Sequence, residues 1–168
     1  MVNKDNGLTL IDFDFCRDIK AVITDNLGTP GFQAPEMQIK NPSYYGAPVD
    51  IFALGVILYA LDMQCLPFEI YRDASDKAYQ PRVTTSKYAE VQESYNKKRA
   101  TKILNGVPVL QEDAVKLMFL CLHPNPKSRM TLDIMKQLPY IQSAPRLLYG
   151  QAKTDLEDLL QCPKHLNE

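Results

Sequence analysis

The thiol and imidazole side chains are the first candidates for metal chemistry in this sequence. They are few and lie far apart, at Cys16, Cys65, Cys121, Cys162, His123 and His165. Zinc binding needs clustered thiolates or imidazoles, commonly as a Cys-x-x-Cys pair, and no such pair occurs. We therefore expect no zinc site, and thiols that stay reduced, as is usual in the cytoplasm.

Four short segments carry the strongest functional signal. In chain order they are Ile11-Asp12-Phe13-Asp14, Gly28-Thr29-Pro30-Gly31-Phe32-Gln33-Ala34-Pro35-Glu36, Val49-Asp50-Ile51-Phe52-Ala53-Leu54-Gly55-Val56 and Asn125-Pro126-Lys127-Ser128-Arg129-Met130-Thr131. Each alone is weak, but in this order they resemble the C-terminal lobe of a eukaryotic protein kinase, over roughly residues 1–141. GTPGFQAPE is the most specific and is similar to the end of a kinase activation loop. The resemblance implies ATP-dependent Ser/Thr phosphorylation of proteins by the complete kinase.

The resemblance also implies a metal-binding role for Asp12. It matches the kinase aspartate whose carboxylate binds the Mg²⁺ that bridges ATP phosphates; the alternative is a turn residue at the end of a strand. Asp14 stands where the family has glycine, and glycine reaches backbone conformations that aspartate reaches less easily. This difference bears on switching of the loop and not on metal binding by Asp12. ATP and Mg²⁺ are thus expected in the complete kinase, and neither is expected on this chain alone.

Three further residues acquire structural roles from the resemblance. Glu36 and Arg129 match the partners of a buried ion pair that ties the activation segment to the end of the lobe; the alternative is two unrelated surface charges. Asp50 matches a helix aspartate that accepts backbone N–H bonds from the catalytic loop, and the alternative is a residue placed to interact with the helix dipole. Arg99, in contrast, is expected on a solvated helix face.

The segment before the GTPGF motif carries the candidate regulatory residues. Asp25 lies three residues before Gly28, where many kinases have an activating phosphothreonine, and its charge can partly imitate a phosphate. The alternative is a solvated loop aspartate. Thr24 is the other candidate for phosphorylation, and Thr29 matches a threonine whose hydroxyl meets the catalytic aspartate in active kinases.

Several parts of a kinase do not occur in this sequence. It contains no Gly-rich phosphate loop, no Val-Ala-Ile-Lys strand and no His-Arg-Asp catalytic loop. Phosphoryl transfer depends on these parts together, so we expect no catalytic residue in this chain and no activity from it alone. Three interpretations stay open: a fragment of an active Ser/Thr kinase, a truncated pseudokinase that binds a partner protein, and a helical interaction module that resembles kinases in architecture only.

The elements that must position these residues are mainly helical. Asn6-Gly7 favours a hairpin turn, followed by a strand at residues 8–11, and residues 12–35 read as an extended loop. Apolar spacing predicts helices over residues 49–63, 88–104 and 112–122, and a short one capped by Thr131 that ends at 138. We therefore expect a mainly α fold, a kinase-like C-lobe with a small β-hairpin stub at the N-terminus. This domain covers residues 1–141, and a tail over 142–168 has a capping-box pattern at Thr154 and Glu157 that predicts a short helix.

Composition narrows the class of partner. The chain has 168 residues, which suits one domain, and a net charge of -1, which predicts no nucleic-acid partner. The longest apolar run, Ile51–Leu61, is about half of a membrane span, and the N-terminus lacks a signal-peptide pattern, so we expect a cytoplasmic protein without a membrane segment.

A protein substrate or partner is expected, with the polar residues 69–99 as a candidate contact. Self-association is expected through the lobe surface that the catalytic loop and N-lobe normally cover.

Overall fold

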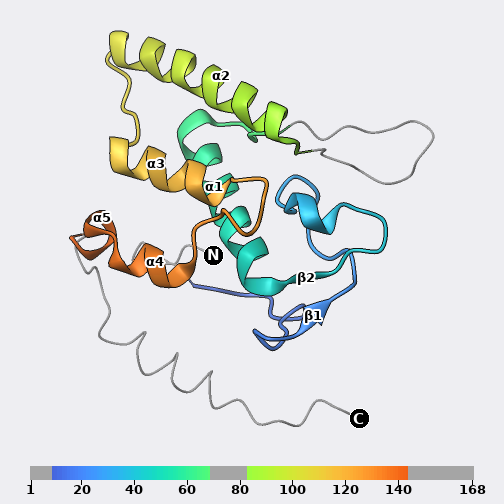
Figure 1. The fold of residues 1–168 in the computed structure, drawn as a ribbon. Helices are drawn as coiled ribbons and strands as arrows, with labels where there is room; N and C mark the ends of the chain where they lie inside the picture. The colour runs from blue at the N-terminus through green and yellow to red at the C-terminus, as the bar shows by residue number, and fades with distance from the viewer. Residues whose placement is uncertain (1–8, 69–82, 144–168) are drawn as a thin grey trace. The chain divides into compact units, whose positions relative to one another are not determined.

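The computed structural model describes residues 9–68 and 83–143 (Figure 1). The chain divides into two units, residues 1–13 with 143–168, and residues 14–142. All helices and strands that the structure describes lie in the second unit. They are β1 (Val22–Ile23), the 3-10 helix η1 (Pro35–Met37), β2 (Tyr44–Tyr45), α1 (Gly46–Met63), α2 (Thr85–Leu104), α3 (Glu112–Cys121), α4 (Leu132–Gln137) and α5 (Pro139–Gln142).

Helix α1 is the central helix of this unit. It begins at Gly46, earlier than the predicted residue 49, because Pro48 is tolerated in a first helical turn, where its missing N–H has no partner to lose. Gln64 ends the helix in the left-handed conformation, with a φ of 58°. Apolar residues lie on all faces of α1, and its buried side chains join both hydrophobic clusters of the unit.

By length and composition, α1 is also the one helix among the described residues that is long and apolar enough to cross a membrane. The helix has 18 residues, more than the apolar run at 51–61 indicated, and 33% of it is buried inside the fold. Core helices of soluble proteins meet the same criterion, so the finding is weak evidence for a membrane span.

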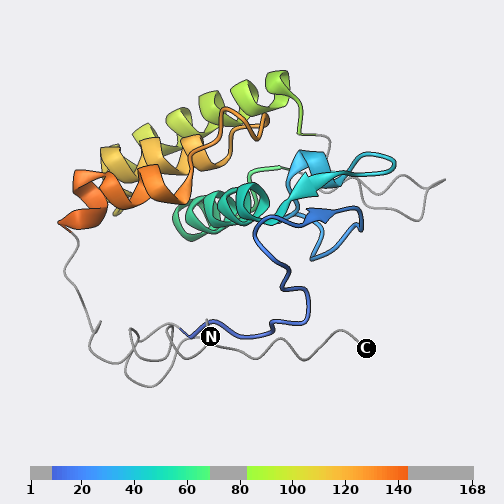
Figure 2. The same cartoon turned by 60° about the horizontal axis from the view of Figure 1, so that its bottom comes forward.

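Helices α2 and α3 cover one side of α1, as Figure 2 shows. Close packing of α1 on α3 is possible because Gly55 has no side chain where the backbone of Leu122 approaches. Helix α2 is mostly solvated, as predicted, but it turns Val91 and Tyr95 into the core. It begins before the predicted Tyr88 because Thr84 caps it, its hydroxyl accepting a hydrogen bond from the Lys87 N–H.

The C-terminal helices are short. The hydroxyl of Thr131 accepts a hydrogen bond from the Ile134 N–H at 3.3 Å, which confirms Thr131 as the N-cap of α4. Met130 and Met135 from this region pack with Ile51 of α1 in a second cluster. The predicted helix near Thr154 and Glu157 lies outside the described residues.

The small sheet is not where the sequence predicted it. Asn6, Gly7 and residue 8 lie outside the described residues, and residues 9–11 form no strand. Leu10 and Ile11 are exposed, so no packing favours an extended strand there. The described sheet pairs β1 with β2 in antiparallel register. Only β1 lies inside residues 12–35, the region predicted to be an extended loop, and β2 lies after it.

The C-terminal end of α1 is tied to α2 by a buried polar network. The Tyr95 hydroxyl donates a 2.6 Å hydrogen bond to the Asp62 carboxylate. The Lys102 ammonium donates to the Asp62 backbone carbonyl and lies 3.3 Å from the same carboxylate. Tyr59 packs against the Tyr95 ring, with 5.6 Å between centroids. These contacts satisfy a carboxylate that is costly to bury alone.

The buried tyrosines predict a loss of stability in alkali. Burial raises the pKa of Tyr59 from 10.0 to about 12, and burial also raises the pKa of Tyr95. The folded state therefore keeps these protons where the unfolded chain releases them, so the free energy of unfolding should be undiminished below pH 10 and fall as pH rises towards about 12. Urea unfolding across this window should show a shallower decline for Tyr59→Phe. An unchanged decline would contradict the prediction, and Tyr45→Phe, at an exposed position, is the control.

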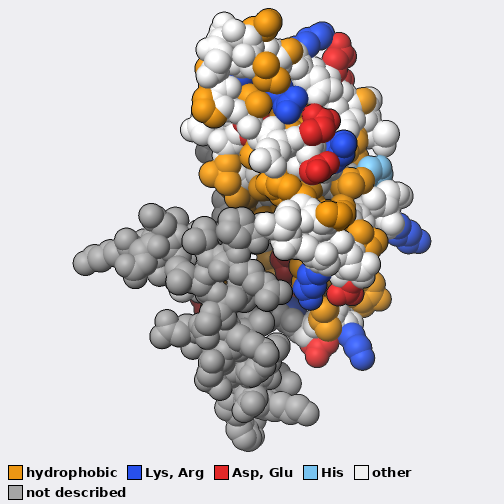
Figure 3. All heavy atoms as spheres, turned by 90° about the vertical axis from the view of Figure 1, so that its left-hand side faces the viewer, with side chains coloured by type: hydrophobic (Ala, Val, Ile, Leu, Met, Phe, Trp, Pro, Cys, Tyr) orange, Lys and Arg blue, Asp and Glu red, His pale blue; other side chains and the backbone are white. Residues whose placement is uncertain are grey.

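The described surface mixes charged and apolar side chains. Figure 3 shows acidic and basic side chains interspersed on one face, with hydrophobic ones between them. Large exposed apolar side chains occur on α1, at the end of α2, and in and before β1, namely Ile57, Leu61, Ile103, Leu104, Phe15, Ile19 and Val22. Interspersed charges give no field of a single sign on the face shown.

Candidate functional site

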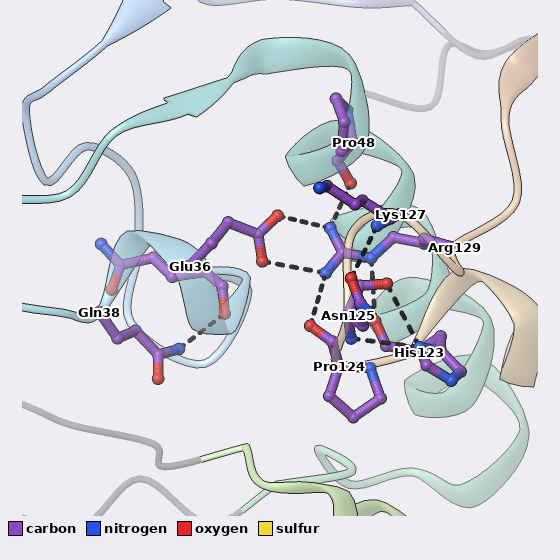
Figure 4. A network of polar contacts seen from close by, with 9 residues as sticks. Glu36, Gln38, Pro48, His123, Pro124, Asn125, Lys127 and Arg129 are labelled. Atoms are coloured by element: carbon purple, nitrogen blue, oxygen red, sulfur yellow. Dashed lines mark hydrogen bonds and ion pairs between the residues drawn. The ribbon is translucent and has the colours of Figure 1, made fainter.

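The central feature of the site is an ion pair between residues far apart in the sequence. Arg129 Nη1 and Nη2 donate to Glu36 Oε1 and Oε2 at 2.7 and 3.0 Å, two parallel bonds from one planar group (Figure 4). The Arg129 side chain is 0% exposed and that of Glu36 14% exposed. The predicted buried pair is therefore formed, with the bidentate geometry that makes such bonds strong.

The remaining donors of Arg129 are also satisfied. Nε donates to the His123 carbonyl at 3.0 Å, Nη1 to the Pro48 carbonyl at 2.7 Å and Nη2 to the Pro124 carbonyl at 3.3 Å. With the two bonds to Glu36, these account for all five N–H donors of a guanidinium. The guanidinium also lies 5.0 Å from the centre of the Phe52 ring, a favourable cation–π distance. One side chain thus joins η1, the start of α1 and the loop after α3.

Local turns hold the two partners in place. Glu36 lies in η1, where Pro35 pre-sets the first helical residue. On the other side, the Asn125 carboxamide oxygen accepts from the Lys127 N–H at 3.0 Å, and the Ser128 N–H donates to the Asn125 carbonyl. These bonds form a compact turn in Asn-Pro-Lys-Ser, a composition typical of turns, and aim Arg129 at η1.

The candidate regulatory residues lie on the surface before η1. Thr24, Asp25 and Thr29 are all exposed. Thr24 and Asp25 directly follow β1, and the Asp25 backbone carbonyl accepts a 2.6 Å hydrogen bond from the Tyr44 hydroxyl. Thr29 begins a tight turn in which its carbonyl accepts from the Phe32 N–H. The structure thus groups these residues in one segment that Glu36 anchors, and their regulatory roles stay predictions.

Asp50 differs from the expected helix-start residue. Since α1 begins at Gly46, Asp50 lies beyond the first turn, where the helix dipole is weak. Within residues 9–68 and 83–143, no group donates a hydrogen bond to its carboxylate. Although Asp50 is exposed, neighbouring atoms remove enough water to raise its pKa above the usual value by desolvation. A carboxylate of this kind is available to accept donors from another segment.

Asp12 belongs to the other unit of the chain, so its position relative to Glu36 is not defined. Its φ is 65°, in the left-handed region that few residues other than glycine adopt. Asp14 does not have a positive φ, so the aspartate in place of glycine is unstrained here. In the described ranges, no three His, Cys, Asp or Glu side chains gather as a metal site. The described residues thus offer Asp12 no cluster of further metal ligands, and its metal-binding role stays a prediction.

The prediction that Arg99 is solvated was wrong. Its side chain is 21% exposed, donates to the Leu110 carbonyl at 3.1 Å and lies 3.6 Å from the Glu112 carboxylate. Its Nε is buried without a hydrogen-bond partner. The helix pattern placed Arg99 on the polar face, but the loop that returns to α3 covers that part of α2.

Sequence reasoning also missed two residues that organise the site. Gln33 is buried and donates to three acceptors in residues 26–28, and the buried Tyr44 donates to Asp25. The signal for Gln33 was a polar residue inside the otherwise apolar Phe32-Gln33-Ala34, and the signal for Tyr44 was a tyrosine directly before an apolar helix. Neither signal identifies the partner.

Comparisons with known proteins identify the family of this chain. The chain matches the protein kinase domain family over residues 1–141. It is 30% identical over 96% of its length to the "Putative serine/threonine-protein kinase YPL150W" of Saccharomyces cerevisiae. It is 26% identical over 84% to maternal embryonic leucine zipper kinase of Danio rerio, and 33% over 82% to the calcium/calmodulin-dependent protein kinase cmkB of Emericella nidulans.

These matches cover 16%, 18% and 31% of the three relatives, so the chain spans less than a third of their length. The family match, in contrast, covers most of this chain and includes both partners of the Glu36–Arg129 pair. The chain therefore belongs to the eukaryotic protein kinase superfamily.

Proposed function

We propose that this chain is part of the C-terminal lobe of a protein Ser/Thr kinase, including its activation segment. The observation that carries the proposal is the buried bidentate pair of Glu36 and Arg129, residues 93 positions apart. It fixes the end of the GTPGFQAPE segment to the loop after α3, the role that the resemblance assigns to it. Similarity to kinases named as serine/threonine-protein kinases supports the same specificity here.

The kinase family implies ATP and Mg²⁺ as cofactors of the full enzyme. In this chain, Asp12 is the residue proposed to bind Mg²⁺, and its positive φ is a conformation found more often at functional sites than elsewhere. Because the described residues provide no further ligand cluster, we propose that the chain alone binds neither cofactor. Asp50 is proposed to accept backbone N–H bonds from the catalytic loop in the complete domain, which its desolvated carboxylate favours.

We predict that the purified 168-residue chain transfers no phosphate from Mg-ATP to generic protein substrates. The physical reason is that the sequence lacks the phosphate loop, lysine strand and catalytic loop that position ATP. Phosphate incorporation should equal that of a reaction without protein, and Asp12→Ala should behave identically. Incorporation above this background that Asp12→Ala abolishes would overturn the prediction.

The coding sequence upstream of Met1 separates the two leading alternatives. An in-frame His-Arg-Asp loop there predicts that the longer protein phosphorylates a protein substrate and that Asp12→Ala removes this activity. A longer protein that contains the loop yet transfers no phosphate would favour the second candidate, a pseudokinase that binds a partner protein. That candidate is favoured by Asp14, which stands in place of the family's glycine.

The partner is proposed to be a protein, as kinase relatives act on or bind proteins; one relative is named a CBL-interacting protein kinase. Exposed apolar side chains such as Ile57 and Leu61 of α1 favour self-association of the isolated chain. Residues 69–82, part of the proposed partner contact, lie outside the described residues. A cytoplasmic location, and the absence of membrane and nucleic-acid contacts, stay predictions.

A further inference from the structure

Residues 24–28 form an exposed loop whose first half is held by Tyr44. The backbones of β1 and β2 pair Ile23 with Tyr44, which fixes the chain directly before Thr24. One residue after Thr24, the Asp25 carbonyl accepts the 2.6 Å hydrogen bond from the Tyr44 hydroxyl. Tyr44 is only 5% exposed, so its ring is held by the core while its hydroxyl reaches the loop. Tyr44 thus contacts the residue before Thr24 and the residue after it.

The second half of the loop is held by Gln33. Its Nε2 lies 2.7 Å from the Asn26 side-chain oxygen, 2.9 Å from the Leu27 carbonyl and 3.3 Å from the Gly28 carbonyl. Gln33 is 8% exposed, and its own carbonyl accepts a 2.8 Å hydrogen bond from Gln38. A buried side-chain amide with three acceptors nearby stabilises a loop conformation more than an exposed amide does. If the loop moved away, the buried amide would be left without hydrogen-bond partners and without water.

The electrostatic surroundings do not favour a phosphate as the ordering group. The charges of Asp25 and Glu36 lie close enough to add to the rise in the Tyr44 pKa, which burial mainly causes. A phosphate on Thr24 would be added next to the carboxylate of its neighbour Asp25. Three arginines lie in the described ranges. Arg129 directs all its donors to Glu36 and backbone carbonyls, Arg17 donates to the Asp14 and Cys16 carbonyls, and Arg99 donates to the Leu110 carbonyl. A phosphate orders a loop through charge-assisted hydrogen bonds from nearby basic side chains, most often arginines.

We propose that Tyr44 and Gln33 are positioning residues that hold residues 24–28 in their ordered conformation without phosphorylation of Thr24. The inference rests on the proposed function only where it identifies this loop as part of a kinase activation segment. The hydrogen bonds themselves belong to the isolated chain, so the ordering can be tested without kinase activity.

Hydrogen exchange of the unphosphorylated 168-residue chain tests the proposal. Tyr44→Phe keeps the ring and removes the one hydroxyl, so amides of residues 24–28 should exchange about two- to tenfold faster, the range for one lost hydrogen bond. Amides of α1 and α3 should be unchanged. The matched control is Tyr45→Phe in the same strand, whose exposed ring has no such bond and which should alter nothing. Gln33→Met is the second variant and should speed exchange at residues 26–28.

Two results would overturn the proposal. One is unchanged loop exchange in both Tyr44→Phe and Gln33→Met. The other is an equal rise in α1 and α3, which would mean that the residues support the core as a whole. The longer kinase gives a second readout. If Tyr44 and Gln33 only supported the fold, their substitution would lower kcat/KM for the protein substrate and for ATP equally. If they position the loop, substitution should raise the KM for the protein substrate and leave the KM for ATP unchanged.

Thr24→Ala separates this inference from the proposed function. It should leave loop exchange unchanged in the chain and protein phosphorylation unchanged in the longer protein. Loss of activity in Thr24→Ala, restored by Thr24→Glu, would show that a charge at this position orders the loop and would contradict the inference. A longer protein without any kinase activity, whose loop still loosens in Tyr44→Phe, would contradict the proposed function and support the inference.

Discussion

Arg129→Met is expected to lower the free energy of unfolding by about 3–5 kcal/mol, the usual cost of breaking a buried ion pair. Methionine keeps much of the apolar stem but removes both bonds to Glu36 and the donors to three backbone carbonyls. The Glu36 carboxylate, 14% exposed, would then be left without its partner. Urea unfolding measures this loss. The slope of the free energy of unfolding against urea concentration should stay unchanged, because a changed slope would indicate a change in the denatured state.

Lys97→Met is a better control than a change at Arg99, which the structure shows to be partly buried. Lys97 lies on the solvated surface of α2, where its side chain is 74% exposed and forms an ion pair with the exposed Glu93. Exposed pairs of this kind contribute at most about 1 kcal/mol, so Lys97→Met should have a small effect. If both substitutions lowered the free energy of unfolding equally, the buried Glu36–Arg129 pair would contribute no more to stability than the exposed Lys97–Glu93 pair.

A double substitution identifies the source of the loss. Glu36→Gln combined with Arg129→Met removes the stranded charge, so it should cost less than the sum of the two single changes. Because the two side chains are in direct contact, an additive result would contradict the geometry. The cycle thus tests the contact itself and not only the importance of each residue.

The parts of this fold that the sequence predicted are those with a local cause. Thr131 was identified as an N-cap because its side chain needs only the N–H three residues later. The end of α2 at Leu104, as predicted, also has a local cause, since the nearby Gly106 adopts a φ of 68° that favours glycine. The Glu36–Arg129 pair is not local, and it was predicted only through the kinase resemblance of the two segments that carry it.

The parts that were missed depend on contacts between distant segments. The Tyr44 hydroxyl meets a carbonyl 19 residues earlier, and nothing in the residues around Tyr44 specifies that partner. The β1–β2 pairing has only two residues in each strand, too few to produce an alternating pattern in the sequence. Arg99 was placed on the solvated face because periodicity describes a helix alone and not the loop that covers it.

Gly55→Ala is expected to destabilise the fold by about 1–3 kcal/mol, although alanine is the better helix former by about 1 kcal/mol. A β-carbon at residue 55 would lie 2.9 Å from Cys121 Cβ and from Leu122 Cγ, and 3.1 Å from the Leu122 backbone nitrogen. These atoms belong to α3 and its C-cap, so they cannot move without separating α3 from α1. Overpacking should therefore exceed the gain in helix propensity.

Gly46→Ala in the same helix is the matched control for this substitution. Its added β-carbon would meet only the end of the Ile23 side chain, at an ordinary contact distance of 3.8 Å. We therefore expect Gly46→Ala to leave the urea midpoint unchanged or raise it slightly, while Gly55→Ala lowers it. If both substitutions raised the midpoint, α1 and α3 would not approach as closely as the structure has them. The close approach matters for the site, because α1 carries Pro48 and Phe52, and α3 leads into the loop that carries Arg129.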